Sequence, residues 1–343
     1  MTPVSAQTVS PTAEIGPPPP FDPECAAALS PVPEWLAQSV SPDTIGLRRA
    51  GERKESLPTD DALRRDGRFI VEERSVPGPE GAPEISLLIC KPTSVSAPTP
   101  AAYHVHGGGM IGGYKRTTIL EVLDWAHELE MAVVSIDYRL APEHPYPAPV
   151  EDCYTGLVWV AAHADELNID PTRLVIAGVS AGGGLSAAVA LLARDRLGPA
   201  LAGQLLLSPM LDDRNDTGSA RQLAGLGVWD RTSNETGWTA LLGDARGGPD
   251  VSPYAAPARA TDLSGLPPAF IDVGSAETFR DESVAYASRL WQAGGVAELH
   301  VWPGGFHGYP GLAPRARISQ ETVAMRLRWL RRLLIGPPPV SKV

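Results

Sequence analysis

The sequence predicts an α/β fold in which helices wrap a mostly parallel sheet. From residue 101 onward, apolar strand-like runs alternate with helical stretches, and such alternation is typical of parallel strands joined by crossover helices. With 343 residues and 43% apolar side chains, the chain has the size of one large α/β domain or two ordinary ones. The same apolar content excludes wholesale disorder.

Each element of this fold follows from a local residue pattern. Two strand-like runs precede residue 101 with only the turn Pro77–Pro79 between them, so we expect them to form an antiparallel edge. Strands are predicted at about Phe69–Val76, Ile85–Cys90, Ala101–Val105, Ala132–Ile136, Leu174–Val179, Gln204–Leu207, Ala269–Val273 and Ala297–Trp302. Helices are predicted at about Thr118–Glu130, Ala148–His163, Ala181–Arg194 and Glu282–Ala293.

Two segments resemble membrane-associated sequences. Leu174–Ala193 carries no charge, but glycines and serines crowd its first half, so we predict a strand, a tight turn and a buried helix. Arg326–Leu334 is basic and amphipathic, but three of its leucines share one helical stripe with Val323. We therefore predict a final helix that packs this stripe on the sheet, points its arginines outward and ends at Gly336.

Charge and cysteine content exclude several classes of partner. The net charge of −11 argues against a surface for nucleic acid or for anionic membranes, which bind to an excess of basic residues. Cys25, Cys90 and Cys153 are far apart and form no CxxC pair, so neither a disulfide framework nor a zinc site is expected. The amino terminus has no basic region followed by an apolar core. We therefore expect a reducing compartment, the cytoplasm.

A tight turn at Ser180 is the strongest chemical signal. Residues Gly178–Gly182 read Gly-Val-Ser-Ala-Gly between an apolar strand and an apolar helix, which is the context that a G-x-S-x-G nucleophile elbow requires. The glycines leave room for close backbone approach. The serine hydroxyl then lies at a helix N-terminus, where backbone amides favour negative charge. Ser180 is therefore the predicted nucleophile.

Glycines also follow the strand that ends at Val105. After His106, the three glycines Gly107–Gly109 have no side chains, so their main-chain N–H groups can point into a site. Together with the amide of Ala181, these groups would form an oxyanion hole.

A competing interpretation assigns these glycines to a dinucleotide site. Gly107, Gly109 and Gly112 spell G-x-G-x-x-G, and Asp137 follows at the end of the next strand. The acidic residue lies thirty residues after the first glycine (137 − 107 = 30), against about twenty expected for a ribose partner. This interpretation also leaves the serine turn unexplained, so we disfavour it.

A serine nucleophile needs a base and an acid that orients the base, in the chain order serine, acid, histidine. Two histidines follow Ser180. His300 lies inside a strand pattern, whereas His307 lies in a glycine-rich loop from which an imidazole can reach a serine. His307 is therefore the predicted base.

The acid is expected near the end of the strand Ala269–Val273. The following loop offers Glu277 and Asp281, and Asp272 within the strand is a weaker candidate. Asp281 lies at the expected start of a helix, where an N-cap role would occupy its carboxylate. Glu277 is our first choice, and Asp281 stays open.

Together these stretches resemble the hormone-sensitive-lipase-like esterases, a bacterial branch of the α/β-hydrolase superfamily. The similarity covers about residues 67–335 and is carried by Tyr103–Gly109, Asp137–Pro145, Gly178–Gly183 and the loop that ends at His307. The resemblance implies an α/β-hydrolase fold, with an eight-stranded, mainly parallel sheet flanked by helices under a helical cap. It further implies a serine carboxylesterase that cleaves short- to medium-chain esters and needs no cofactor and no metal.

The resemblance also assigns roles residue by residue. By the matching motifs, Ser180 is the nucleophile and His307 is the base. The oxyanion amides would be those of Gly108, Gly109 and Ala181. The family's acid is usually an Asp four residues before the Asp of an Arg-Asp-Glu sequence. In this sequence Glu277 lies four residues before Asp281, and α/β-hydrolases use either Asp or Glu as the acid. The residue before the serine is commonly Asp or Thr in the family, and Val179 departs from that pattern.

Other charged residues have structural interpretations. The resemblance gives Asp137–Pro145 a structural role in fixing the loop near the serine. Glu151 and Asp152 are adjacent on a predicted helix and face different ways, so we expect a solvated pair. His104 and His106 share one strand face, but no third ligand at matching spacing suggests a metal site.

On this interpretation the chain divides into four parts. Residues 1–62 form an arm and part of the cap, residues 63–209 and 264–343 form the core, and residues 210–263 form a cap insertion. Up to about residue 33, where prolines are frequent, we expect either an irregular arm or a disordered tail. Four aromatic residues of the cap parts would form either an apolar lip over the site or the cap's own core: Phe21, Trp35, Trp229 and Trp238.

Two alternatives to the esterase stay open at this point. The same residues would hydrolyse an amide or an N-acetyl group, because the motifs do not separate the two reactions. The same scaffold also serves as a non-catalytic small-molecule receptor, as in the plant gibberellin receptor, although the intact His307 argues against that role. The expected partner is a small ester. A homodimer is compatible with the resemblance, but no residue requires one.

Overall fold

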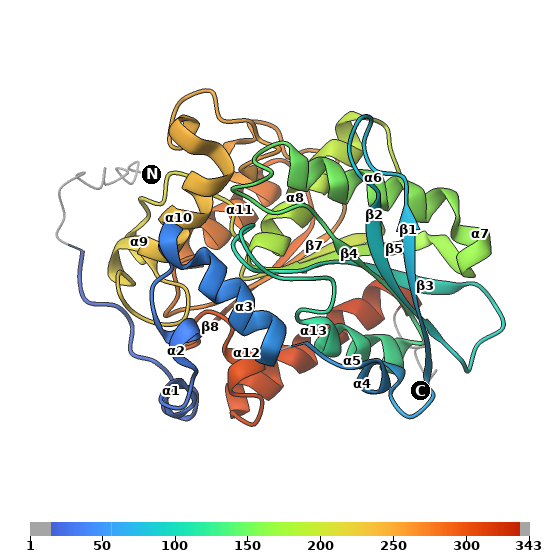
Figure 1. Ribbon diagram of the computed structural model, residues 1–343, viewed down its shortest axis with the longest axis horizontal. Coiled ribbons are helices and arrows are strands. Elements are labelled where there is room, and N and C mark those ends of the chain that lie inside the picture. Colours follow the sequence, from blue (N-terminus) through green and yellow to red (C-terminus); the bar gives the residue numbers. More distant parts are fainter. Residues whose placement is uncertain (1–14, 56, 337–343) are drawn as a thin grey trace, which may run out of the picture.

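The computed structural model describes residues 15–55 and 57–336 and contains one eight-stranded sheet (Figure 1). The strands are β1 (Phe69–Val76), β2 (Ile85–Pro92), β3 (Thr99–Val105), β4 (Ala132–Asp137), β5 (Ile169–Val179), β6 (Gly203–Leu207), β7 (Ala269–Gly274) and β8 (Ala297–Trp302). Their order is β1-β2-β4-β3-β5-β6-β7-β8. The pairs β1–β2 and β2–β4 are antiparallel and all others are parallel. The predicted fold class and antiparallel edge are confirmed.

Helices connect and flank these strands. They are α1 (Pro23–Leu29), α2 (Glu34–Ala37), α3 (Ile45–Glu55), α4 (Asp60–Arg64), α5 (Ile119–Leu129), α6 (Ala148–Ala162), α7 (Ala164–Leu167), α8 (Ala181–Asp195), α9 (Gly218–Gln222), α10 (Arg231–Leu242), α11 (Arg280–Gln292), α12 (Tyr309–Leu312) and α13 (Arg317–Ile335). The four helices predicted between strands are present within two residues at each end. Among the described residues, no helix is both long enough and apolar enough to cross a membrane.

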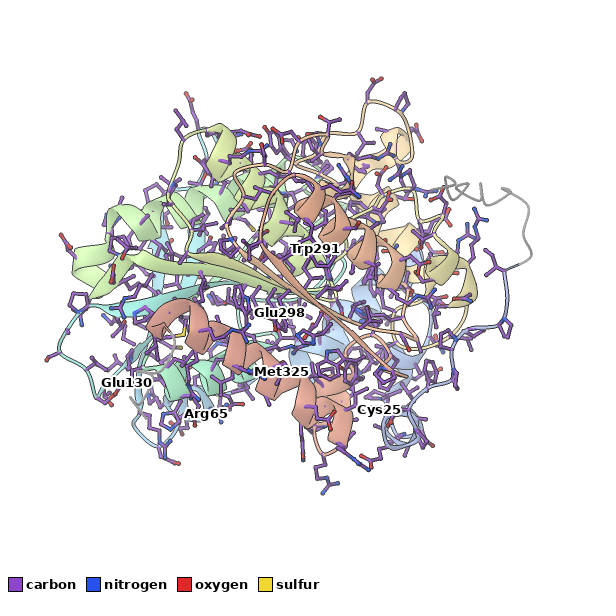
Figure 2. The ribbon with its side chains drawn as sticks, turned by 180° about the vertical axis from the view of Figure 1, so that it is seen from behind. Cys25, Arg65, Glu130, Trp291, Glu298 and Met325 are labelled. Carbon is purple, nitrogen blue, oxygen red and sulfur yellow. The ribbon has the colours of Figure 1, made fainter. Side chains whose placement is uncertain are left out.

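Alternating side chains of the central strand β5 face two separate cores. Leu174 and Ile176 pack in the core that includes α6 and α8. Val175 and Ala177 pack in the opposite core, which includes α5 and α13. Figure 2 shows α13, with Met325 labelled, crossing this second face. Since both faces are covered, the strands of the centre read as continuous apolar runs.

The described residues 15–55 lie beside the segment 210–263 (Figure 1). The hydroxyl of Ser39 donates to Asp230 at 2.9 Å, and the amide of Val40 donates to the Ser233 hydroxyl at 2.9 Å. The prediction of an irregular arm up to residue 33 is wrong for Pro23–Leu29, where Asp22 caps α1 by accepting from two amides. Residues 1–14 of that arm lie outside the described residues. The four-part division itself stays a prediction.

The prediction that α13 points its arginines outward is wrong for Arg326. Its side chain is 5% exposed and pairs with Asp272 of β7, which is 1% exposed. Two bonds join them, Nε to Oδ2 at 2.6 Å and Nη2 to Oδ1 at 3.0 Å, and Glu121 of α5 accepts a third. Asp272, the weakest candidate acid, is thus committed to holding α13 on the sheet.

We predict that Arg326→Met lowers the free energy of unfolding by about 3–5 kcal/mol, because it leaves the Asp272 carboxylate buried without its cation. Urea denaturation at pH 7 measures the change. The control is Arg328→Met, on the exposed face of the same helix, which should change stability by less than about 0.5 kcal/mol. Equal effects of the two substitutions would contradict the assigned role of the pair.

Candidate active site

Ser180 lies in a strained turn between β5 and α8. Its backbone has φ 59° and ψ −123°, in a region that a non-glycine residue adopts only when its surroundings enforce it. The Ser180 amide donates to the carbonyl of Leu207 at 2.8 Å. The neighbouring glycines are required, because a Cβ at Gly178 would lie 2.2 Å from the carbonyl oxygen of Gly182. The turn thus presents the hydroxyl at the first turn of α8.

His307 and Glu277 extend a hydrogen-bonded chain from Ser180. The distance between Ser180 Oγ and His307 Nε2 is 3.0 Å, and that between His307 Nδ1 and Glu277 Oε1 is 3.1 Å. All three side chains are buried. The loops after β5, β7 and β8 supply them, so all three lie at the carboxyl edge of the sheet, where open α/β sheets place their sites.

The second oxygen of Glu277 is also held. Oε2 accepts from the Ser208 hydroxyl at 2.9 Å and from the Gly274 amide at 3.0 Å. Our sequence interpretation did not single out Ser208. A usable signal was its position directly after β6, at the same sheet edge.

The other candidate residues lie elsewhere. Asp281 accepts from the Ser219 amide at 2.7 Å and from Arg280. The N-cap of α11 is Phe279, so the predicted N-cap role of Asp281 is wrong. His300 lies within β8, as expected, and bonds Glu298.

The carbonyls of the loop after β3 are turned toward the protein. Tyr138 donates its hydroxyl to the carbonyl of His106 at 2.9 Å, and the His106 Nδ1–H donates to the carbonyl of Gly107 at 2.8 Å. The carbonyl of a residue and the N–H of the next residue belong to one planar peptide and point in opposite directions. Anchoring the Gly107 carbonyl therefore turns the N–H of Gly108 away from it.

The next peptide follows the same rule. The Gly108 carbonyl accepts from the amides of Ile111 and Gly112, at 3.1 and 2.9 Å. Gly108 and Gly109 have φ of +118° and +64°, which side-chain-bearing residues rarely adopt. Within residues 15–55 and 57–336, neither of their amides donates to an acceptor. These N–H groups, and that of Ala181 at the start of α8, are therefore available to an external acceptor.

The four aromatic residues of the cap parts make different contacts, although Trp229 and Trp238 belong to one buried core. The ring of Trp229 lies against the loop, 2.1 Å from where a Cβ of Gly109 would be, so only glycine fits there. Trp238 is fully buried in a core. Phe21 packs edge-on against Phe306, and Trp35 lies over Gly51 of α3. Trp229 is thus the one of these four that lines the predicted oxyanion glycines.

The stretch Asp137–Pro145 braces this site. Besides the bond from Tyr138, the amide of Ala141 donates to the carbonyl of Met110 at 2.9 Å. Arg139 forms a two-pronged ion pair with Asp152, at 2.8 and 2.6 Å. Asp152 is 2% exposed, so the expectation of a solvated pair with Glu151 is wrong for this residue.

Two further interpretations of the sequence, a dinucleotide site and a metal site, can be compared with the contacts that their residues make. Asp137, the ribose partner of the dinucleotide interpretation, accepts from the Lys115 amide at 3.3 Å. His104 bonds the hydroxyls of Ser135 and Thr118 at 2.8 and 3.2 Å. Over the described part of the chain, no group of three or more His, Cys, Asp or Glu side chains is arranged to hold a metal ion.

The fold and this site define the class of protein. The sequence model of a family described as alpha/beta hydrolase fold matches residues 102–311, and the chain belongs to this family.

Named relatives narrow the class. The chain is 37% identical to carboxylesterase NlhH of Mycobacterium tuberculosis over 295 residues, which are 84% of this chain and 90% of the relative. It is 35% identical to esterase LipI of the same species, over 78% and 83% of the two chains. Among solved structures, a bacterial heroin esterase superposes with a TM-score of 0.82 at 39% identity, over 92% and 98% of the two chains. The resemblance to the hormone-sensitive-lipase-like branch is confirmed.

The two histidines of β3 and its loop make stability depend on pH. Burial lowers the pKa of His104 to about 3 and that of His106 to about 4. In the unfolded chain both imidazoles titrate near the ordinary value of about 6.5. As pH falls below that value the unfolded state takes up protons first, so stability is lost.

We predict that the free energy of unfolding is lower at pH 5 than at pH 7 by about 2 kcal/mol for each of these imidazoles. Urea denaturation at the two pH values measures the difference. His104→Gln should remove about half of it, whereas His144→Gln, at an exposed position, should leave it unchanged. A pH dependence that is undiminished in His104→Gln would exclude this histidine as a source.

Proposed function

We propose that this protein is a serine carboxylesterase that hydrolyses short- to medium-chain carboxylic esters through an acyl-enzyme. The observation that carries the proposal is the hydrogen-bonded chain Ser180–His307–Glu277 beside a strained strand-to-helix turn. The names of its relatives, carboxylesterase and esterase, support the same reaction.

Ser180 is the nucleophile in this proposal. Its Oγ attacks the ester carbonyl carbon while His307 Nε2, 3.0 Å away, accepts the hydroxyl proton. Glu277 accepts the hydrogen bond of His307 Nδ1–H and stabilises the imidazolium that forms. Ser208 and Gly274 bond the second carboxylate oxygen, so the carboxylate has little freedom to turn away from the ring.

The amides of Gly108, Gly109 and Ala181 stabilise the negative charge that develops on the carbonyl oxygen. The N–H groups of Gly108 and Gly109 are held in orientation because the carbonyls of the same peptides accept hydrogen bonds, and the N–H of Ala181 is held by the start of α8. These donors therefore need no reorganisation when charge forms. Loss of one such donor costs about 10²–10³ in turnover.

The intermediate then collapses in two stages. His307 gives its proton to the leaving alkoxide, which departs as the alcohol and leaves an acyl group on Ser180. Water next adds to the acyl carbonyl and gives a proton to His307 Nε2. The second intermediate releases the carboxylic acid and returns the proton to Ser180 Oγ. Ester and water are thereby converted to acid and alcohol, and the enzyme is regenerated.

We predict that Ser180→Ala lowers kcat for p-nitrophenyl butyrate by about 10⁴-fold or more, because no acyl-enzyme can form. A p-nitrophenyl ester series from acetate to laurate gives kcat/KM for the wild type and the variant. Activity should fall beyond medium acyl chains. Full turnover by the variant would refute the role of Ser180, and a wild type inactive on every ester would favour an amide substrate or a receptor.

A second comparison identifies the acid. We predict that Glu277→Gln lowers kcat by about 10²–10⁴, since an amide no longer stabilises the imidazolium. Asp281→Asn, the matched control, should be nearly as active as the wild type because Asp281 bonds Ser219 and Arg280. Steady-state rates at pH 8 on one ester are sufficient. The reverse order of effects would transfer the role to Asp281.

A further inference from the structure

Helix α3 contacts the loop that carries the proposed oxyanion amides. It precedes the segment 102–311 that the family model matches, and no sequence motif marks it. Arg49 and Glu52, three residues apart, lie on one face of the helix. Arg49 Nε donates to the carbonyl of Ile111 at 2.6 Å, and Glu52 Oε2 accepts from the amide of Gly113 at 2.8 Å. The helix therefore holds a carbonyl and an amide of the same turn.

These two bonds fix the orientation of the glycine peptide. The amides of Ile111 and Gly112 donate to the carbonyl of Gly108, whose peptide partner is the N–H of Gly109. The contact is tight, since a Cβ at Gly108 would lie 2.3 Å from the carbonyl oxygen of Gly112. A shift of Ile111 or Gly113 therefore rotates the Gly108–Gly109 peptide, and with it the proposed oxyanion donor.

The two side chains are themselves braced. Arg49 donates to the carbonyl of Ala141 at 2.8 Å and binds both carboxylate oxygens of Glu143, at 2.7 and 2.8 Å. Glu52 pairs with Arg48 at 3.2 Å, and both of these side chains are 11% exposed. Arg48 in turn lies over the rings of Trp35 and Trp229. Arg49 and Glu52 thus belong to a connected network of side chains and do not make isolated contacts.

We propose that Arg49 and Glu52 are positioning residues that hold the oxyanion loop in its reactive conformation. This inference rests on the proposed esterase function. Neither residue touches the reacting atoms. Each acts through the Gly108–Gly113 turn, so its loss affects stabilisation of the oxyanion and leaves the Ser180–His307–Glu277 chain in place.

The test compares Glu52→Ala and Glu52→Gln with Glu321→Ala, an exposed glutamate on α13. For Glu52→Ala on p-nitrophenyl butyrate, kcat should fall by about 10-fold or more, a part of the 10²–10³ that one oxyanion donor is worth. KM and the midpoint of the pH–kcat profile should stay unchanged. The amide oxygen of Glu52→Gln can still accept from Gly113, so this variant should recover most of the activity.

The inhibition constant Ki of a trifluoromethyl ketone distinguishes a positioning role from a merely structural one. The ketone adds to a serine hydroxyl and leaves an oxyanion, so its Ki should rise in Glu52→Ala by the same factor by which kcat/KM falls. The folded fraction is checked by urea denaturation. If Glu52→Ala does not fold, Arg49→Lys replaces it, because it removes the fork that spans Ile111 and Ala141, and it should show the same pattern.

Three results would overturn the inference. They are a kcat equal to that of Glu321→Ala, a rise in KM alone, and a Ki that does not follow kcat/KM. Failure of the proposed function looks different, because an active Ser180→Ala would refute the mechanism whatever Glu52 does.

Discussion

The rest of the site depends on the backbone of one residue. Ser180 adopts a positive φ that its side chain disfavours. The conformation persists because its amide donates to Leu207, the last residue of β6, and its carbonyl accepts from the amide of Met210. Only glycine fits at positions 178 and 182, because a Cβ there would lie 2.2 Å from the carbonyl oxygen of Gly182 and 2.0 Å from that of Val105, respectively. The strain aims the hydroxyl at the edge of the sheet where the loops after β7 and β8 end.

A second constraint is the planarity of the peptide group. The loop after β3 has its carbonyls bonded to Tyr138, His106 and its own amides, so the N–H groups of Gly108 and Gly109 must face the other way. The protein thus orients its proposed donors indirectly, by satisfying the acceptors behind them. That arrangement makes α3 and the Asp137–Pro145 stretch part of the same machinery, although neither supplies a reacting group.

The sequence predicted the parts that local patterns encode. The central strands are apolar runs, and turn context and chain order single out Ser180, Glu277 and His307, whose side chains meet in the structure. The buried charges of Asp152 and Arg326 were missed because their partners lie on other elements, and helical periodicity alone assigns such residues to solvent. The hydrogen bonds from α3 to the loop after β3 were not predicted for the same reason. Arg49 and Glu52 bond main-chain atoms about sixty residues away, and no local sequence pattern indicates such contacts.

The central claim is that the Ser180 hydroxyl, activated by His307, attacks an acyl carbon. The most direct measurement is intact mass followed by peptide mapping after reaction with a p-nitrophenyl alkylphosphonate, which transfers one phosphonyl group to an activated serine and releases p-nitrophenol. The account predicts one adduct per chain, located on the peptide that contains Ser180, formed together with one equivalent of p-nitrophenol. An adduct on any other residue, or a folded protein that takes up none, would contradict it.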